Sequence, residues 1–355
     1  MSDPNVLVYR LGSLGDSIIA LPAFHGVRRA FPSAQITLLT NKPVASKAAP
    51  VESVLGGAGL FDDVLDYPVG TRNPFILLRL LARLRGLRLD AVFNLAEYRS
   101  DKATARDRFF FQISGAKKLY GFDLAARDKA PVPDPQTGEV EWEAARIARR
   151  VEPLTRVSLE SADFWDLRLS ETESQEAWRR LAPLGDSSKP IAFSTGTKVQ
   201  SKHWGLENWA ALVRRVSGEF PGHSAVFLGS GDEFAEAERC RAAWEGPSLN
   251  LCGACTPRVS AAVLRKCRLF VGHDSGPMHL AACVGVPCVA VFSARNIPRQ
   301  WLPRGNFNQI LYHRTDCAGC GLEVCTAQKK KCLSAISVDE VACAVRCVLE
   351  TTVGC

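Results

Sequence analysis

The chain has 355 residues, enough for two domains of ordinary size that each bury their own core. Hydrophobic residues make up 46% and charged residues 23%, a balance that excludes an intrinsically disordered protein. The net charge of +7 suits an anionic partner such as a nucleotide, a phosphorylated glycan or a membrane surface. Nucleic acid is not an expected partner, because the sequence has no zinc-finger spacing with histidines and no RNA-binding aromatic motif.

No secretory signal or membrane span is expected. The opening residues 1–5 contain neither a basic region nor an apolar region of the kind that directs secretion. The longest apolar stretch, residues 280–293, is broken by Gly285 and Pro287 and is too short to span a bilayer. We therefore expect a cytoplasmic protein.

Strands and helices alternate through the first half of the chain. A buried strand over residues 6–10 ends in a glycine-rich turn and precedes a helix. This alternation predicts a parallel sheet with helices on both faces. The expected strands are 6–10, 36–40 and 91–95, the expected helices are 17–30, 74–85 and 140–154, and residues 123–138 form a surface loop. The helix at 74–85 is strongly apolar and basic.

A linker composition at residues 183–190 predicts a domain boundary there, giving domains of 1–185 and 186–355. The same alternation then begins again. The expected strands are 191–194, 225–228, 269–272 and 288–292, and the expected helices are 207–219, 233–244, 260–266, 278–284 and 338–349. Two doubly wound α/β domains predict a ligand cleft between them, at the carboxyl ends of their strands.

The loop after the first strand, Arg-Leu-Gly-Ser-Leu-Gly-Asp-Ser at residues 10–17, has two glycines that allow a tight turn. Asp16 follows them at or near a helix N-terminus, where the helix dipole favours a negative charge. Two interpretations are open at this point. Asp16 is either a helix cap or a carboxylate that acts as a general base in the cleft.

A second strand-end loop contains Thr195, Lys198 and Lys202. Hydroxyl and backbone N–H groups can donate hydrogen bonds to diphosphate oxygens, and lysines supply positive charge. The order and glycine spacing do not match a Walker A loop. The alternative is an ordinary polar loop with solvated lysines.

A third strand-end loop, Gly-His-Asp-Ser-Gly-Pro-Met-His at residues 272–279, leads into a helix. Its amides at Ser275 and Gly276 would form an anion site at the helix N-terminus, with His279 in the first turn and Asp274 just before it. The alternative is a capped helix with a buried histidine. Residues 228–233 begin like a dinucleotide-binding loop but lack the third glycine, so Asp232 or Glu233 is expected to hold ribose hydroxyls instead.

Cysteines are frequent, and most are expected to be small buried residues in a reducing compartment. Cys252 and Cys255 have a redox-type spacing but are expected to be inert. Four thiols in one compact loop could bind structural zinc or iron, and the alternative is a loop without metal. These four are Cys317, Cys320, Cys325 and Cys332.

Several of these motifs resemble glycosyltransferase family 9, the ADP-heptose:lipopolysaccharide heptosyltransferase family. The specific pair is Val-Tyr-Arg-Leu-Gly-Ser-Leu-Gly-Asp-Ser-Ile-Ile-Ala-Leu-Pro-Ala at residues 8–23 and Gly-His-Asp-Ser-Gly-Pro-Met-His-Leu-Ala-Ala at residues 272–282. Further matches are residues 28–32, 99–100, 113–116, 121–123 and 202–204. The resemblance extends in order through nearly the whole chain.

The resemblance implies a GT-B fold of two Rossmann-like domains facing a central cleft, with acceptor binding in the first domain and donor binding in the second. It also implies inverting transfer that requires no cofactor or metal. Asp16 would be the general base that deprotonates the acceptor hydroxyl. Thr195, Lys198, Lys202, Ser275, Gly276 and His279 would hold the donor diphosphate, Glu233 the ribose, and Asp274 would order the phosphate loop. Gly15 and Arg99 would lie on the acceptor side.

The implied partners are a nucleotide diphosphate sugar, ADP-heptose first, and an anionic glycan or lipid-linked saccharide. Peripheral association with the inner face of the inner membrane follows from such an acceptor. Three alternatives share these loops: a transferase with another donor or a protein acceptor, a nucleotide-sugar epimerase or hydrolase, and a non-catalytic nucleotide-sugar-binding protein. The presence of both Asp16 and the 272–279 loop argues against the last.

Overall fold

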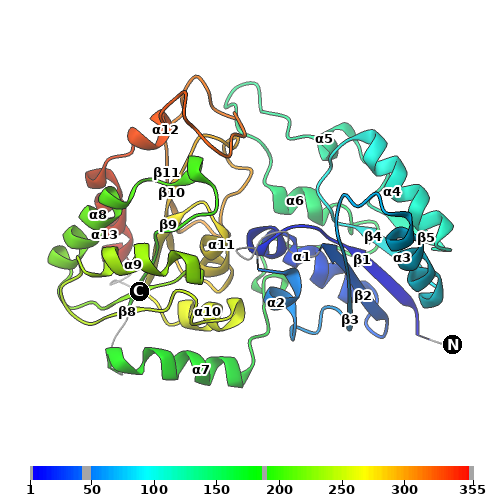
Figure 1. Ribbon diagram of the computed structural model, residues 1–355, viewed down its shortest axis with the longest axis horizontal. Helices are drawn as coiled ribbons and strands as arrows, with labels where there is room; N and C mark the ends of the chain where they lie inside the picture. Colours follow the sequence, from blue (N-terminus) through cyan, green and yellow to red (C-terminus); the bar gives the residue numbers. More distant parts are fainter. Residues whose placement is uncertain (1–2, 42–48, 186–189, 352–355) are drawn as a thin grey trace. The chain divides into compact units, whose positions relative to one another are not determined.

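The computed structural model describes residues 3–41, 49–185 and 190–351. The chain divides into two compact units, Met1–Arg168 and Leu169–Cys355, each built around its own parallel sheet (Figure 1). Within the described segments, no helix has both the length and the apolar character needed to span a bilayer.

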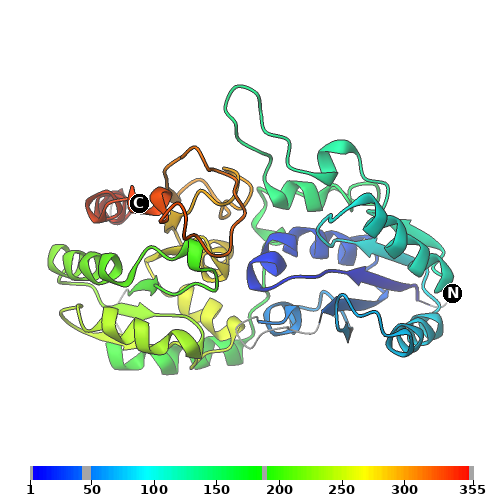
Figure 2. The same cartoon turned by 45° about the horizontal axis from the view of Figure 1, so that its top comes forward.

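The N-terminal unit contains a five-stranded parallel sheet in the order β3-β2-β1-β4-β5 (Figure 2). Its central strand β1 is buried on both faces, which explains its continuous apolar sequence. Val6 pairs in register with Ile36 on one side and Ala91 on the other, so the neighbouring strands end at the same edge. The strands are β1 (Asn5–Tyr9), β2 (Gln35–Asn41), β3 (Asp63–Tyr67), β4 (Ala91–Asn94) and β5 (Lys118–Tyr120).

Helix α1 is buried almost all round because it lies between the sheet and other helices. Helix α6 and the short 3₁₀ turn η1 pack on α1, and every residue from Ser17 to Val27 is buried. A Cβ atom at Gly26 would lie 2.9 Å from the Val157 side chain, so glycine permits this close approach. The helices of this unit are α1 (Leu14–Ala30), α2 (Val51–Leu55), α3 (Pro74–Leu87), α4 (Asp101–Ile113), α5 (Ala126–Lys129), α6 (Glu143–Ala148) and η1 (Ala162–Phe164).

The C-terminal unit contains a six-stranded parallel sheet in the order β11-β10-β9-β6-β7-β8. Strands β6, β9 and β10 at its centre are buried along their whole length. The strands are β6 (Ile191–Ser194), β7 (Ala225–Phe227), β8 (Ser248–Asn250), β9 (Leu269–His273), β10 (Cys288–Phe292) and β11 (Gln309–Tyr312). The helices are α7 (Glu171–Leu181), α8 (Leu206–Glu219), α9 (Phe234–Arg241), α10 (Pro257–Leu264), α11 (Gly276–Cys283), α12 (Lys331–Ser334) and α13 (Val338–Thr351), with 3₁₀ turns η2 (Ala182–Leu184), η3 (Gln200–Lys202) and η4 (Gly231–Glu233).

The division between the units lies at Arg168 and Leu169, earlier than the boundary expected at 185 and 186. Helix α7 belongs to the C-terminal unit because it packs against α10. Glu173 of α7 accepts hydrogen bonds from the guanidinium of Arg258 in α10 at 2.5 and 3.0 Å. The segment predicted as a linker, residues 183–190, follows α7 in the chain, and its residues 186–189 lie outside the described residues.

The helix expected over residues 140–154 is much shorter in the structure. Only α6 is helical there, and turns follow it from residue 149. Pro153 disfavours helical geometry at Glu152, so the helix could not have extended to residue 154. The expected surface loop at 123–138 also contains the short helix α5.

Helix α4 and strand β3 were missed because their patterns are weak. Phe111 is the one buried residue that α4 contributes, so no apolar stripe recurs along it. Strand β3 is an edge strand that alternates Asp63, Val64, Leu65 and Asp66, and Leu65 alone is buried. Edge elements with one anchoring residue give little periodic signal.

Replacing Glu173 with Gln tests whether α7 is anchored to the C-terminal unit. Gln keeps an oxygen for the Ser170 amide but removes the charge that pairs with Arg258, which is 8% exposed. We expect a loss of about 1–2 kcal/mol in the free energy of unfolding at neutral pH, measured by denaturant titration.

Burial raises the pKa of Glu173, but the hydrogen bonds from Arg258 and from the Ser170 amide outweigh it, so the pKa is lowered overall. The stabilisation is therefore present above the carboxyl's ordinary pKa and is lost as pH falls through the lowered value. The variant and the wild type should converge in acid. Glu171→Gln, on the exposed side of the same helix turn, is the control, and an equal effect from it would contradict the assignment.

Candidate active site

The loop after β1 contains a turn that requires glycine at one position. Gly12 has a φ of +138°, a conformation that other residues rarely adopt. A Cβ atom at Gly12 would lie 2.4 Å from Cβ of Asp16. The Gly12 N–H donates to Oδ1 of Asn41 at the end of β2, at 2.9 Å. The turn therefore joins the ends of β1 and β2 to the start of α1.

The two carboxylate oxygens of Asp16 have different surroundings. Oδ2 accepts hydrogen bonds from the Ser13 amide at 2.7 Å and from the Ser13 hydroxyl at 3.1 Å. Oδ1 lies 3.9 Å from the Arg10 guanidinium, and no described residue donates a hydrogen bond to it. The side chain is 30% exposed. The two interpretations of Asp16 are thus compatible, because Oδ2 caps the helix while Oδ1 remains able to accept a proton.

Arg10 connects Asp16 to the centre of the sheet. Its side chain is 2% exposed, and it donates to the carbonyl of Leu95 after β4 at 2.6 Å and to the carbonyl of Asp16 at 2.8 Å. An arginine directly after an all-apolar buried strand is rarely buried without partners. That contrast is visible in the sequence, although no role for Arg10 was predicted from it.

A second buried arginine supports the same strand end. Arg150 donates to the carbonyls of Asn94 and Ala96, and burial lowers the pKa of its guanidinium to about 10. Glu97 follows directly after this segment and remains partly exposed. Burial raises the pKa of Glu97, and the carboxylates of Glu143 and Asp16 raise it further. Glu97 is therefore a second carboxyl group whose charge interacts with that of Asp16, and the sequence did not single it out.

The two residues expected on the acceptor side, Gly15 and Arg99, differ in their relation to Asp16. Arg99 is exposed and pairs with Asp107 of α4 at 2.7 Å. Gly15 is half-buried in the first turn of α1, directly before Asp16.

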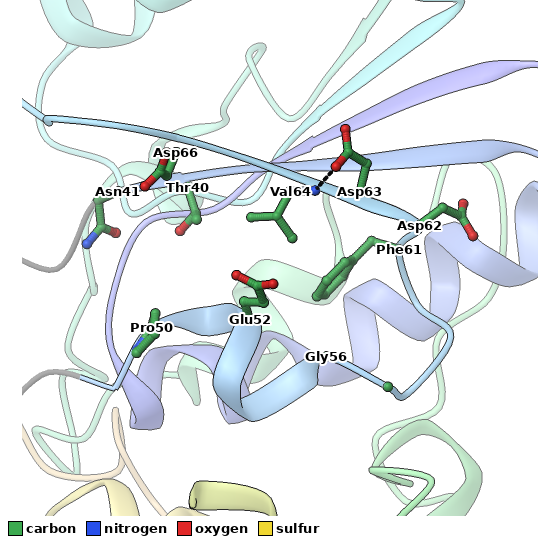
Figure 3. Close-up of a pocket in the computed structure, with 11 residues that line it drawn as sticks. Thr40, Asn41, Pro50, Glu52, Gly56, Phe61, Asp62, Asp63, Val64 and Asp66 are labelled. Carbon is green, nitrogen blue, oxygen red and sulfur yellow. Dashed lines mark hydrogen bonds between the residues drawn. The ribbon is translucent and has the colours of Figure 1, made fainter.

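An acidic pocket of about 510 Å³ lies between α2 and strands β2 and β3 of the N-terminal sheet (Figure 3). Figure 3 shows the Glu52 carboxylate rising from α2 toward the strands. Asn41 both lines this pocket and accepts the Gly12 N–H, so the pocket borders the loop that holds Asp16. The buried Thr40 hydroxyl on its wall has no hydrogen-bond partner among the described residues. The lining residues are Thr40, Asn41, Pro50, Glu52, Gly56, Gly57, Phe61, Asp62, Asp63, Val64 and Asp66.

In the C-terminal unit the structure separates the roles of the two lysines in the loop after β6. Lys198 is exposed, whereas Lys202 is 14% exposed and reaches the loop after β9. Lys202 Nζ donates to a carboxylate oxygen of Asp274 at 2.8 Å and to its carbonyl at 3.0 Å. An ammonium group has three N–H donors, so one remains for a ligand. Asn296 donates to the same Asp274 oxygen at 3.2 Å.

His273, at the end of β9, is a buried neutral imidazole. Its Nε2 accepts from the Trp204 amide at 3.0 Å and from the Trp209 indole N–H at 3.2 Å. Because both partners can only donate, the proton is on Nδ1, which faces the Gly196 carbonyl at 3.3 Å. Burial, followed by the neighbouring His203, lowers the pKa of His273 to about 3. His273 therefore joins the loops after β6 and β9 without a charge.

The N-terminus of α11 follows this junction. Ser275 is the residue before the first helical turn, and Gly276 and Pro277 begin the helix. Amides at such a position favour an anion. His279 is 4% exposed in the first turn. The expected residues Asp274, Ser275, Gly276 and His279 therefore lie together, with Lys202 beside them.

Glu233 lies against two strand-end loops of the same unit. Cβ atoms at Gly196 and Gly229 would lie 2.4 and 2.5 Å from its carboxylate oxygens. Its Oε2 accepts from the Ser230 amide at 2.7 Å, while Oε1 faces Gly196. Thr195 is buried at the end of β6, beside the Cys240 thiol. Glu233 and Thr195 therefore border the same edge of the sheet as Lys202.

The C-terminal cysteine loop is held by main-chain contacts. The Ser201 amide donates to the Glu323 carbonyl at 3.0 Å, and the Cys325 amide donates to the side-chain oxygen Oε1 of Gln200 at 2.9 Å. Cys332 is buried in the core while Cys320 is exposed. In the segments that the structure describes, no three His, Cys, Asp or Glu side chains are grouped closely enough to hold a metal ion. The loop braces the segment that contains Lys202, and a metal at the four cysteines stays a prediction.

The family assignment comes from a match over most of the chain. Residues 78–331 match the family model described as glycosyltransferase family 9 (heptosyltransferase). The chain belongs to this family. The predicted membership of glycosyltransferase family 9 is thereby confirmed, and so is the GT-B type of its two units.

Individual relatives of this family 9 protein are distant. It is 26% identical over 345 residues to lipopolysaccharide heptosyltransferase 1 of Pseudomonas aeruginosa, covering 91% of this chain and 88% of that protein. It is 28% identical over 166 residues to lipooligosaccharide heptosyltransferase 2 of Campylobacter jejuni, where the match spans 44% of this chain and only 50% of that relative. The structure of the ADP-heptose lipopolysaccharide heptosyltransferase II of Escherichia coli superimposes with a TM-score of 0.68 at 18% identity, covering 98% of this chain and 99% of that one. The last likeness establishes the fold.

Replacing Gly12 with Ala tests whether the turn before Asp16 is as constrained as its geometry indicates. The new Cβ would collide with Cβ of Asp16, and the backbone conformation is strained for alanine. We expect a loss of about 1–3 kcal/mol in the free energy of unfolding. Gly86→Ala is the matched control, because a Cβ there meets no atom within 4 Å and the residue lies in α3. That change should be neutral or stabilise by up to about 1 kcal/mol, and a destabilisation equal to that of Gly12→Ala would show that the turn at Gly12 is not specially constrained.

Proposed function

We propose that this chain is an inverting glycosyltransferase that transfers heptose from ADP-heptose to a saccharide of the lipopolysaccharide core or a related glycan. Its membership of glycosyltransferase family 9 and the heptosyltransferase names of its relatives support this donor and acceptor class. The single observation that the proposal depends on is Asp16, whose Oδ1 is held at a strand end with no hydrogen-bond donor of its own among the described residues.

In this proposal Asp16 is the general base. Its Oδ1 takes the proton of the acceptor hydroxyl as that oxygen attacks the anomeric carbon of the donor sugar. The new C–O bond forms on the face opposite the leaving group, and the bond from the anomeric carbon to the β-phosphate oxygen breaks. The electron pair of that bond leaves with ADP. Ser13 fixes the rotation of the carboxylate by two hydrogen bonds to Oδ2, so little reorganisation is needed.

The C-terminal unit would hold the donor and stabilise the departing diphosphate. The amides at the start of α11 and the remaining N–H of Lys202 point to one anion site, with His279 in the same turn. Fixed positive groups of this kind supply the charge that a divalent cation supplies in metal-dependent transferases, so we propose transfer without a bound metal. Glu233 is placed to accept hydrogen bonds from the ribose hydroxyls.

The acidic pocket beside the Asp16 loop suits part of the acceptor. Carboxylates such as Glu52 and Asp66 accept hydrogen bonds from sugar hydroxyls and repel phosphates. The anionic groups of a lipopolysaccharide acceptor would therefore lie outside this pocket. A lipid-linked acceptor also implies that the enzyme works at the cytoplasmic face of the inner membrane.

Asp16→Asn tests the general base directly. Asn keeps an oxygen for the Ser13 amide but cannot take the acceptor proton, so we expect the rate of heptosyl transfer to fall at least about 100-fold. Binding of ADP should stay at the wild-type affinity, because the proposed donor residues lie in the other unit. Transfer is measured by release of ADP with donor and acceptor present.

Asp101→Asn is the matched control, since Asp101 is an exposed carboxylate in the first turn of another helix of the same unit. Its transfer rate should equal that of the wild type. Transfer by Asp16→Asn at the wild-type rate would reject the general-base assignment, and loss of ADP binding would show that the variant is damaged elsewhere.

A further inference from the structure

One segment of the N-terminal unit holds most of the net positive charge of the protein. Residues 68–89 contain five arginines and no Asp or Glu, so the segment has a charge of +5, compared with +7 for the whole chain. Helix α3 forms the larger part of it. Nothing in the proposed transfer reaction uses these arginines.

Helix α3 presents apolar and basic side chains together on its outer face. Leu80 and Leu84 anchor its inner face in the core of the sheet. On the opposite side Phe75 is 79% exposed and Leu78 is 60% exposed, and Arg79 and Arg83 are exposed beside them. We call Phe75, Leu78, Arg79 and Arg83 the outer α3 face. Spacings of three and four residues place these side chains on neighbouring turns of one side.

The end of the neighbouring helix α4 extends this surface. Phe109 is 62% exposed and Ile113 is 36% exposed, one turn apart. Arg85 of α3 donates to the Ile113 carbonyl at 3.0 Å, which joins the ends of the two helices. Both helices pack on the same core cluster of the sheet.

The arginines of the outer α3 face are not neutralised within the protein. Two other exposed arginines of this unit are paired, Arg108 with Asp123 and Arg99 with Asp107. Among the described residues, no carboxylate lies within ion-pair distance of Arg79 or Arg83. An exposed aromatic ring beside unpaired guanidinium groups suits a partner that has negative charge at its surface and an apolar interior beneath it.

We propose that the outer α3 face docks on an anionic lipid bilayer. Phe75 and Leu78 enter the boundary between headgroups and acyl chains, while Arg79 and Arg83 contact lipid phosphates. The anionic surface adds attraction for each arginine, and that attraction weakens with salt. This inference rests on the proposed function in one respect: membrane docking would bring the enzyme to a lipid-linked acceptor.

Vesicle cosedimentation of the full chain tests the proposal without donor or acceptor. Wild-type protein should bind vesicles of phosphatidylglycerol and phosphatidylcholine and should not bind phosphatidylcholine alone. Phe75→Ser with Leu78→Ser should weaken binding at least about tenfold. Arg79→Glu with Arg83→Glu should weaken it at least about 25-fold, since each arginine near an anionic surface contributes about fivefold.

Two controls distinguish binding by the outer α3 face from effects of net charge and of exposed apolar side chains in general. Arg214→Glu with Arg314→Glu imposes the same change of net charge on exposed residues of the other unit, and Val132→Ser removes an apolar side chain that is 64% exposed. Both controls should bind vesicles nearly as the wild type does. All variants should bind ADP and unfold at the wild-type temperature, which keeps this test separate from that of the transfer reaction.

Three results would overturn the proposal. The first is wild-type protein that does not distinguish anionic from neutral vesicles. The second is an equal loss of binding in the two arginine pairs, or unchanged binding in Phe75→Ser with Leu78→Ser. The third is wild-type protein that does not bind vesicles and is a dimer by light scattering, while the variants of the outer α3 face are monomers. That result would assign the surface to a second copy of the chain.

Discussion

The position of Asp16 depends on the buried positive charge of Arg10. Arg10 emerges from the central strand and places its guanidinium on the carbonyls of Leu95 and Asp16, with the Asp16 carboxylate 3.9 Å away. A buried guanidinium is stable only while its partners stay in place, because an unpaired buried charge is costly. The end of β4 and the first turn of α1 are therefore fixed to the end of β1. Asp16 obtains its position from this connection.

The C-terminal unit uses a neutral group for the same purpose. His273, directly after the core of β9, holds the amide of Trp204 and faces the carbonyl of Gly196, while Lys202 and Asp274 neutralise each other beside it. The anion site that we propose at α11 thus follows a loop whose charged side chains neutralise each other. In each unit a buried polar residue at the end of a central strand positions the groups that we propose to meet the substrates.

The sequence predicted the central strands, α1 and the phosphate-loop helix because each combines a buried apolar run with a glycine turn. The motifs around Asp16 and at residues 272–279 also indicated the correct family. It could not identify Asn41, Arg150 or Glu97, since their importance comes from strands that are distant in sequence and adjacent in the sheet. The boundary predicted at 185 and 186 left the segment of α7 with the N-terminal domain, because the packing of α7 on α10 leaves no local signal in the sequence. The four cysteines were proposed as metal ligands because they lie in one compact loop. Sequence spacing does not determine whether their thiols converge, so the metal stays a prediction.

The central claim is that this family 9 protein uses an ADP-linked sugar, and calorimetric titration of the purified chain with ADP, UDP and GDP tests it most directly. The experiment is done without added divalent cation. We expect ADP to bind more tightly than the other two nucleotides. Tighter binding of UDP or GDP would keep the fold and reject the heptose donor, and no binding of any nucleotide would contradict the transferase itself.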